Sequence, residues 1–361
     1  MSGHCMRWKN NHLSSFFTGI IFAGLFLFST LSHAYDASNH NLAVSNGLKA
    51  SGDIFDNKTM SNLGRALMKP DSDQWYNLPA HCDGGDYLSP KNNDGKEYPI
   101  SRNQANDYYN QCVREMVRYL NAAVQAASGL VLPAGSGYKI DTTQLINSKD
   151  CGNNDEWAWV KGKYDSNGIW KMGSYKPSGL SQDSRAKCRV LRNFGRILHA
   201  TTDFYAHTNY ADKANPAMPI GVTNPPGLDL APTPAPLLET YSLWKYRNSL
   251  ADPEGEKADQ AMKDKIEKSE DRFPVNLTSG CWVYSDEEYQ SKCKNRISES
   301  STMQKDRSTD NRSLAAKGNF ENTFATATAD VLRQWEILKA ALNDKYGPER
   351  ATYMIDAISK N

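Results

Sequence analysis

The sequence predicts one mainly α domain, a helical bundle with a small β-hairpin insertion and long loops. Apolar residues recur at helical spacing in several long stretches, one short aromatic segment carries a hairpin turn pattern, and one proline-rich stretch excludes regular structure. The chain has 361 residues, of which 39% are hydrophobic, so it is long enough to bury a core. No internal repeat or shift in composition divides it. We therefore expect a single domain over residues 35–361.

The first 34 residues have the pattern of a signal peptide. Arg7 and Lys9 precede an apolar run over residues 16–31, and Ser32-His33-Ala34 forms a small-x-small cleavage pattern. The run is shorter than the ~18–20 residues of a spanning helix, although an uncleaved membrane anchor is the alternative. Cleavage after Ala34 would make Tyr35 the first mature residue. The sequence thus predicts a secreted protein, extracellular or periplasmic.

Six cysteines remain after the predicted signal peptide is removed. They are Cys82, Cys112, Cys151, Cys188, Cys281 and Cys293. An even number in an oxidising compartment predicts three disulfides. The sequence allows many pairings, of which we favour the sequential one with a short Cys281–Cys293 loop. A cysteine zinc site is the alternative, but the chain lacks the C-x-x-C spacing typical of one.

The helices are predicted from capping residues and apolar periodicity. Ser101 and Gln104 form a capping box ahead of apolar residues at four-residue steps from Tyr108 through Cys112, Met116 and Leu120 to Val124. A second helix is expected from Ser184 to about Asn209. Two more are expected over residues 320–342 and, beginning at Gly347-Pro348, to about residue 358.

Three other segments depart from this helical pattern. Residues 157–175 centre on Asn167-Gly168, which predicts a two-residue β-hairpin turn. The aromatic residues of this hairpin would pack a small satellite core or, alternatively, lie at a bilayer interface. Residues 215–236 are rich in proline and predict a long surface loop. The charged run 254–271 is expected to be a solvated helix or a linker.

The strongest chemical signal is the spacing of His199, Asp203 and His207. These residues stand at i, i+4 and i+8 on a predicted helix, so they drift only ~40° per step and share one face. The outer histidines are ~12 Å apart along the axis, whereas zinc bonds are about 2.0–2.2 Å. A single zinc ion therefore does not easily bind all three side chains. Two metal ions ~3.5–4 Å apart would bind them, with Asp203 bridging the two ions. The alternative is two satisfied histidines and a surface aspartate.

The same stretch resembles a known family. Residues 195–210 read G-R-x-L-H-x-x-x-D-F-Y-A-H-[ST]-N-Y, which is similar to the signature of Het-C-like secreted proteins within the zinc-dependent phospholipase C and single-strand nuclease superfamily. Patches over residues 277–347 are similar as well. The resemblance implies a helical bundle of the zinc-dependent phospholipase C type, exported, with two or three Zn²⁺ ions at a phosphodiester-cleaving site.

The resemblance also implies a set of metal ligands. They are the α-amine of Tyr35 and the side chains of His40, His81, Asp83, His199, Asp203 and His207. His40 and His81 would otherwise be cap or surface residues. No histidine follows His207, so the last His-containing ligand pair of the family has no match. Carboxylates such as Glu239 are then expected to complete the site.

These observations predict an enzyme, a secreted zinc-dependent phosphodiesterase that cleaves the glycerol-side phosphodiester bond of phospholipids at a membrane surface. Zinc lowers the pKa of bound water and neutralises phosphoryl charge, and Asp83 or Asp203 would hold the water and take its proton. The chain has 42 basic and 41 acidic residues, so no stable nucleic acid partner is expected. The alternatives are a single-strand nuclease-type phosphodiesterase and a non-catalytic, metal-stabilised secreted recognition protein.

Overall fold

The computed structural model describes residues 36–361 apart from short gaps. The gaps are residues 75, 147–149, 152–156, 161–162, 165–169, 172–173, 178–183, 254–255, 269–272 and 284–288. The described residues all belong to one compact unit, residues 33–361. The predicted signal peptide and Tyr35 lie outside the described residues.

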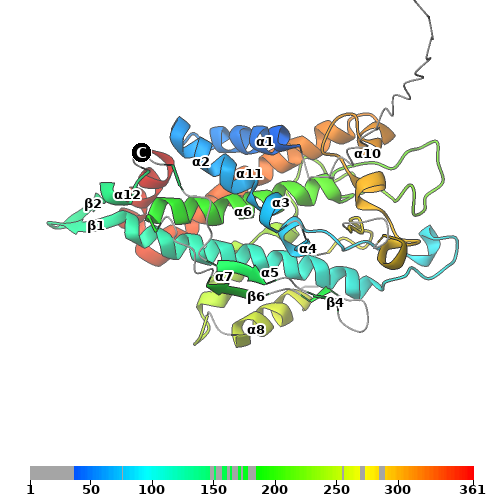
Figure 1. Cartoon of the computed structure of the whole chain (residues 1–361), viewed down its shortest axis with the longest axis horizontal. Helices are drawn as coiled ribbons and strands as arrows, with labels where there is room; N and C mark the ends of the chain where they lie inside the picture. Colours follow the sequence, from blue (N-terminus) through cyan, green and yellow to red (C-terminus); the bar gives the residue numbers. More distant parts are fainter. Residues whose placement is uncertain are drawn as a thin grey trace, which may run out of the picture. The chain divides into compact units, whose positions relative to one another are not determined.

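Three long helices run side by side through the unit, which confirms a mainly α fold (Figure 1). They are α5 (Arg102–Ala127), α6 (Ala186–His207) and α11 (Asn319–Tyr346). The shorter helices are α1 (Ala37–Ala50), α2 (Asn57–Leu67), α3 (Lys69–Asp73), α4 (Leu78–His81), α7 (Tyr241–Asn248), α8 (Glu256–Glu267), α10 (Asn311–Ala315) and α12 (Pro348–Ser359). α6 lies at the centre, because α2, α5 and α11 all pack against it.

The predicted helix starts are confirmed where a capping motif supports them. Ser101 Oγ accepts from the Gln104 N–H at 3.2 Å, and the Gln104 side chain accepts from the Ser101 N–H at 2.7 Å, so the capping box begins α5. The predicted apolar stripe of α5 is buried. α6 ends at His207, two residues before the expected position. The Asn209 side chain instead donates to the carbonyls of Pro226 and Asn276, which draws the chain away from the helix axis.

The charged run is a helix rather than a linker. α8 buries Ala258, Met262 and Ile266 at helical spacing, whereas Lys257, Asp264 and Lys265 are exposed, so it is amphipathic. Residues 215–235 contain no helix, as their prolines predict.

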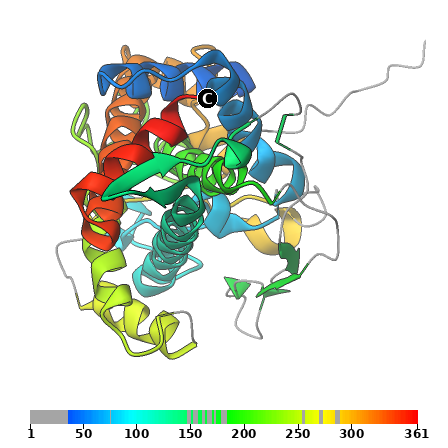
Figure 2. The ribbon, with the colours of Figure 1, turned by 90° about the vertical axis from the view of Figure 1, so that its left-hand side faces the viewer.

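Two hairpins interrupt the helices. β1 (Val131–Ala134) pairs antiparallel with β2 (Gly137–Ile140) across a turn in which Gly135 has φ 60°, and this hairpin was not predicted. Figure 2 shows it lying against α12. The predicted hairpin consists of β3 (Trp157–Val160) with β6 (Ser174–Pro177) and of β4 (Lys163–Tyr164) with β5 (Trp170–Lys171).

The strand pairs of the predicted hairpin share one register. Tyr164 lies opposite Trp170, and Trp157 lies opposite Pro177. Residues 165–169, which include the expected Asn167-Gly168 turn, and the aromatic side chains of the hairpin lie outside the described residues.

All six cysteines of the described residues form disulfides in the sequential pattern that we favoured. The pairs are Cys82–Cys112, Cys151–Cys188 and Cys281–Cys293, so a cysteine zinc site is excluded for these residues. Three disulfides indicate an oxidising compartment. Within the ranges described, no helix has both the length and the apolar character needed to cross a bilayer.

The contact between α2 and α6 positions the centre of the fold. A Cβ built on Gly195 of α6 would lie 2.7 Å from the Ala66 Cβ and 2.8 Å from the backbone of Ala66 and Leu67. Only glycine therefore permits this approach of the two helices. Gly64 of α2 differs, because its Cβ would meet only the end of the exposed Asn41 side chain.

We predict opposite effects for alanine at these two glycines. Gly195→Ala should destabilise the protein by about 1–3 kcal/mol, since the overpacked backbone of α2 cannot yield, whereas Gly64→Ala should gain up to about 1 kcal/mol of helix propensity once Asn41 rotates away. Chemical denaturation of both variants at one fixed zinc concentration measures the difference. Equal stabilities for the two variants would show that α2 and α6 do not approach as described.

Candidate metal centre

The face of α6 that carries the predicted motif is buried. His199, Asp203 and His207 are at most 2% exposed, because α2, α5 and α11 enclose the helix. Burying an ionisable side chain is costly unless another charge or a hydrogen bond compensates it. Other elements of the fold therefore have to supply partners to this face.

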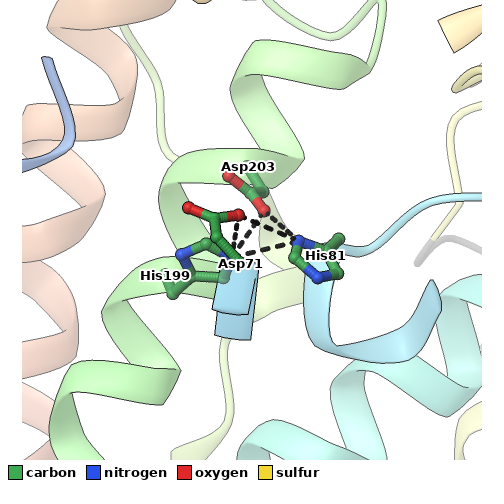
Figure 3. A group of neighbouring side chains, drawn as sticks. All are labelled: Asp71, His81, His199 and Asp203. Atoms are coloured by element: carbon green, nitrogen blue, oxygen red, sulfur yellow. Dashed lines mark hydrogen bonds and ion pairs between the residues drawn. The ribbon is translucent and has the colours of Figure 1, made fainter. Parts of the chain in front are cut away.

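Asp203 is the centre of a first cluster, made of His40, Asp71, His81, His199 and Asp203. One Asp203 oxygen, Oδ2, lies 2.8 Å from His81 Nδ1 and 2.9 Å from His199 Nε2, and the other, Oδ1, lies 3.2 Å from His40 Nε2. The two ring nitrogens of His81 and His199 are 3.0 Å apart. Asp71 Oδ1 completes the group at 3.9 Å from His81 and 3.6 Å from His199. Figure 3 shows four of these side chains pointing toward one another.

The turn after α2 brings Asp71 and His81 to α6. Pro70 lies in the first turn of α3, where its missing N–H has no consequence, and α3 carries Asp71. α4 ends at His81, and the next residue, Cys82, has the left-handed φ of 54° and is bonded to Cys112 of α5. The disulfide thus fixes the end of the short helix that presents His81.

In His81 and His40, the ring nitrogen that points away from Asp203 is hydrogen-bonded. These bonds determine which nitrogen of each ring carries the proton and which presents a lone pair to Asp203. His81 Nε2 lies 3.2 Å from the Gln74 carbonyl, which only accepts, so this nitrogen carries the proton. Thr202 Oγ1 donates to the Leu198 carbonyl at 2.8 Å, and it therefore accepts from His40 Nδ1 at 2.7 Å. In the neutral rings, His81 Nδ1 and His40 Nε2 then point lone pairs at a carboxylate. That arrangement requires a proton or a cation between them.

His207 lies in a second cluster with Asp83, Glu299 and Asp306. Its Nδ1 is 3.0 Å from Asp83 Oδ1, and its Nε2 is 3.3 Å from Asp306 Oδ1 and 3.5 Å from Glu299 Oε1. Glu299 is 1% exposed, and neither of its carboxylate oxygens has a hydrogen-bond partner. Three buried carboxylates against one imidazole leave negative charge uncompensated. A cation would correct that imbalance.

The metal-free chain compensates these charges with protons. At His81, burial alone would lower the pKa, but Asp203 and Asp71 outweigh it and raise the pKa to about 9. Burial would raise the pKa of Asp203, yet the neighbouring histidines hold it well below its usual value. Burial and the negative charges of Asp83 and Asp306 raise the pKa of Glu299 to about 8, against the opposing charge of His207. Both clusters thus hold strongly perturbed groups.

The first cluster fits a tetrahedral zinc ion. Zinc bonds of about 2.0–2.2 Å place tetrahedral ligand atoms about 3.3–3.6 Å apart. The atoms of His81, His199, Asp203 and Asp71 are separated by 2.8–3.9 Å where pairs are in contact, and all four lie within 4.8 Å of one another. Asp71 Oδ2 and His199 Nδ1 have no hydrogen-bond partner. Two imidazoles and two carboxylates are donors that zinc accepts in proteins.

The structure divides the predicted ligands between the two clusters. His40, His81, His199 and Asp203 come together in the first cluster, and His207 joins Asp83 in the second. Asp203 contacts His40, His81 and His199. The expectation that it bridges two metal ions, with His207 on the second, stays a prediction. Tyr35 lies outside the described residues. Every histidine of the described residues belongs to one of the two clusters.

The sequence did not predict that Asp71, Glu299 and Asp306 belong to the site. Glu239, named as a substitute ligand, instead accepts from the N–H groups of Tyr241 and Ser242 at the start of α7. Glu299 and Asp306 contact His207, which follows the first cluster's ligands on α6. No spacing pattern marks these carboxylates, because their contacts with α6 are made by tertiary packing.

Comparison with known proteins returns no relative. The chain matches no family model, no curated protein and no solved structure. The resemblance to Het-C-like proteins therefore rests only on the sequence patterns of residues 195–210 and 277–347.

Neighbouring aspartates of α3 provide a matched test of the first cluster. We predict that Asp71→Asn lowers zinc affinity at least about tenfold, because it removes a carboxylate from the buried donor set. Asp73→Asn should leave zinc affinity unchanged, since Asp73 pairs with Lys69 at 2.8 Å. Titration of chelator-treated protein with zinc measures both affinities.

Chelation itself should lower the melting temperature by several degrees, because a ligand that binds only the folded state stabilises it. Two outcomes would contradict the assignment of the first cluster to zinc. One is an unchanged melting temperature after chelation. The other is an equal loss of zinc affinity in the two aspartate variants.

Proposed function

We propose that this chain is a secreted zinc-dependent phosphodiesterase of the phospholipase C type, with phospholipids as substrates. One observation carries the proposal: two buried clusters of histidines and carboxylates include His199 and His207 from a single face of α6. A pair of adjacent metal positions is the usual arrangement for hydrolysing phosphate esters. The similarity of residues 195–210 to the Het-C-like signature supports the same reaction class.

The metal ions would supply an activated water and neutralise charge on the phosphoryl oxygens. His81, His199, Asp203 and Asp71 would hold one ion, and the second cluster would hold another. Asp203 is fully buried, and both of its oxygens face histidines, so its role is that of a ligand. The side chains of Asp71 and Asp83 keep a small exposed area, through which water would reach the two clusters.

Asp83 is therefore the better candidate to take a proton from water. Asp83 contacts His207 through Oδ1. When the Asp83 carboxyl group takes up a proton, the neighbouring imidazole can compensate the change in charge. Of the two acids expected to do this work, Asp83 and Asp203, the geometry favours Asp83.

The burial of the first cluster favours a second candidate, a metal-stabilised secreted recognition protein without catalysis. His40, His199 and Asp203 are all 0% exposed. A purely structural zinc site is closed in this way, whereas a catalytic site keeps a position open to substrate. The balance of 42 basic and 41 acidic residues speaks against a nuclease, whose substrate groove would be basic.

The variant Asp203→Asn tests whether the metal site is catalytic or purely structural. We predict that this variant loses hydrolysis by at least about a hundredfold, because one amide oxygen replaces a carboxylate shared by three histidines. Zinc-loaded wild-type and variant proteins should be assayed on a soluble phosphocholine ester and, in parallel, on single-stranded DNA. Asp73→Asn is the control and should retain activity.

The wild-type substrate profile decides among the candidates. Cleavage of the ester alone supports the phospholipase C type, and cleavage of DNA alone supports the nuclease. A wild-type protein that binds zinc but cleaves neither substrate would identify the recognition protein.

A further inference from the structure

The loop that follows α6 has an unusual composition. Residues 214–228 carry no charged side chain, although 23% of the chain is charged. Within this loop, residues 216–220 read Pro-Ala-Met-Pro-Ile, and all five are exposed. Met218 is 44% exposed and Ile220 is 38% exposed. We refer to residues 215–223 as the apolar loop.

Hydrogen bonds to Asn215 and Asn224 pair part of the backbone of the apolar loop. Asn224 is 2% exposed, and its Nδ2 donates to the carbonyls of Asn215, Met218 and Pro219 at 3.0–3.3 Å. The N–H groups of Ala217 and Met218 are bonded to the Oδ1 and the carbonyl of Asn215. The two prolines have no N–H group. These features reduce the number of backbone groups that would lose hydrogen bonds to water if the tip entered an apolar medium.

The loop is also anchored from below. Val222 packs against the small apolar cluster of Leu88, Tyr98, Ile297 and Met303. Gly221 and Asn224 exchange backbone hydrogen bonds at 3.1 and 3.2 Å. A loop already held in one conformation loses little conformational freedom when it binds.

One buried ion network connects the base of the loop with the second cluster. Arg312 donates to the Pro225 carbonyl at 3.0 Å and pairs with Asp212, which also pairs with Lys305 at 3.1 Å. Lys305 directly precedes Asp306 of the second cluster. Figure 1 shows the loop emerging beyond the C-terminal end of α6, where His207 lies.

We propose that the apolar loop docks the protein on a phospholipid bilayer, with Met218 and Ile220 inserted at the interface. This inference deepens the proposed function and rests on it, because it names the surface at which the substrate would be met. Exposed apolar side chains on a loop whose backbone groups are partly hydrogen-bonded suit the interface of a bilayer, where the remaining groups still meet water. A stable protein interface would need about 800 Å² from each partner, more than five residues offer.

The charge around the loop indicates which bilayers it accepts. Lys213, at the base of the loop, is paired with Asp229 at 3.1 Å. The insertion therefore depends on apolar contact rather than on attraction to anionic lipids, and vesicles of phosphatidylcholine alone should be bound.

Sedimentation with phosphatidylcholine vesicles tests the proposal on the full mature chain. Met218→Asp and Ile220→Asp should each lower the partition coefficient about tenfold or more, because burying an apolar side chain of this size contributes at least that factor. Ile220→Leu should retain binding. Val275→Asp is the matched control, since Val275 is 82% exposed outside the loop, and it should bind as the wild type does. Unchanged melting temperatures would exclude misfolding.

The outcomes distinguish the loop from the reaction. Wild-type protein that cleaves a soluble phosphocholine ester but does not bind vesicles would overturn the docking role and leave the proposed function standing. Wild-type protein that binds vesicles through Ile220 but cleaves no ester would overturn the proposed function and leave the docking role standing. Self-association that Ile220→Asp abolishes, without vesicle binding, would assign the loop to a protein interface and overturn the proposal.

Discussion

The burial of a carboxylate at the centre of α6 is the constraint on which the rest of the arrangement depends. Asp203 has no access to water, so each of its oxygens needs a positive partner or a proton. The partners come from three places in the chain: His40 from α1, His81 from α4 and His199 from α6 itself. The packing of α1, α2 and the α3–α4 turn can be understood as the means of delivering these groups to one helix face.

The second cluster depends on support from outside α6. Asp86 pairs with Arg296 at 2.5 Å, and Asp212 pairs with both Lys305 and Arg312, all of them buried. Lys305 also donates to the carbonyl of Thr208, next to His207. Breaking a buried ion pair by removing one partner typically destabilises a protein by about 3–5 kcal/mol. These pairs therefore fix the segment that carries Glu299 and Asp306 against the end of α6.

The sequence predicted the features that depend on local patterns. The capping box, the apolar stripe of α5 and the shared face of His199 and Asp203 follow from helical periodicity, which needs no knowledge of tertiary contacts. Only four histidines follow the predicted signal peptide, so assigning all of them to one region needed little information beyond their number. Asp71, Glu299 and Asp306 were missed because they are three among 41 acidic residues, and packing alone selects them. The β1–β2 hairpin was not predicted because Pro133 weakens the strand pattern of β1.

The division into two clusters changes the interpretation of the helix motif. Asp203 contacts the histidines of the first cluster, whereas carboxylates surround His207. Imidazole suits zinc, whereas carboxylates suit harder cations as well. Seven residues lie between His199 and His207, so one rigid helix presents two chemically different environments. Both environments are buried, and without a cation they balance their charges only through protons, so cation binding would stabilise the folded chain through α6.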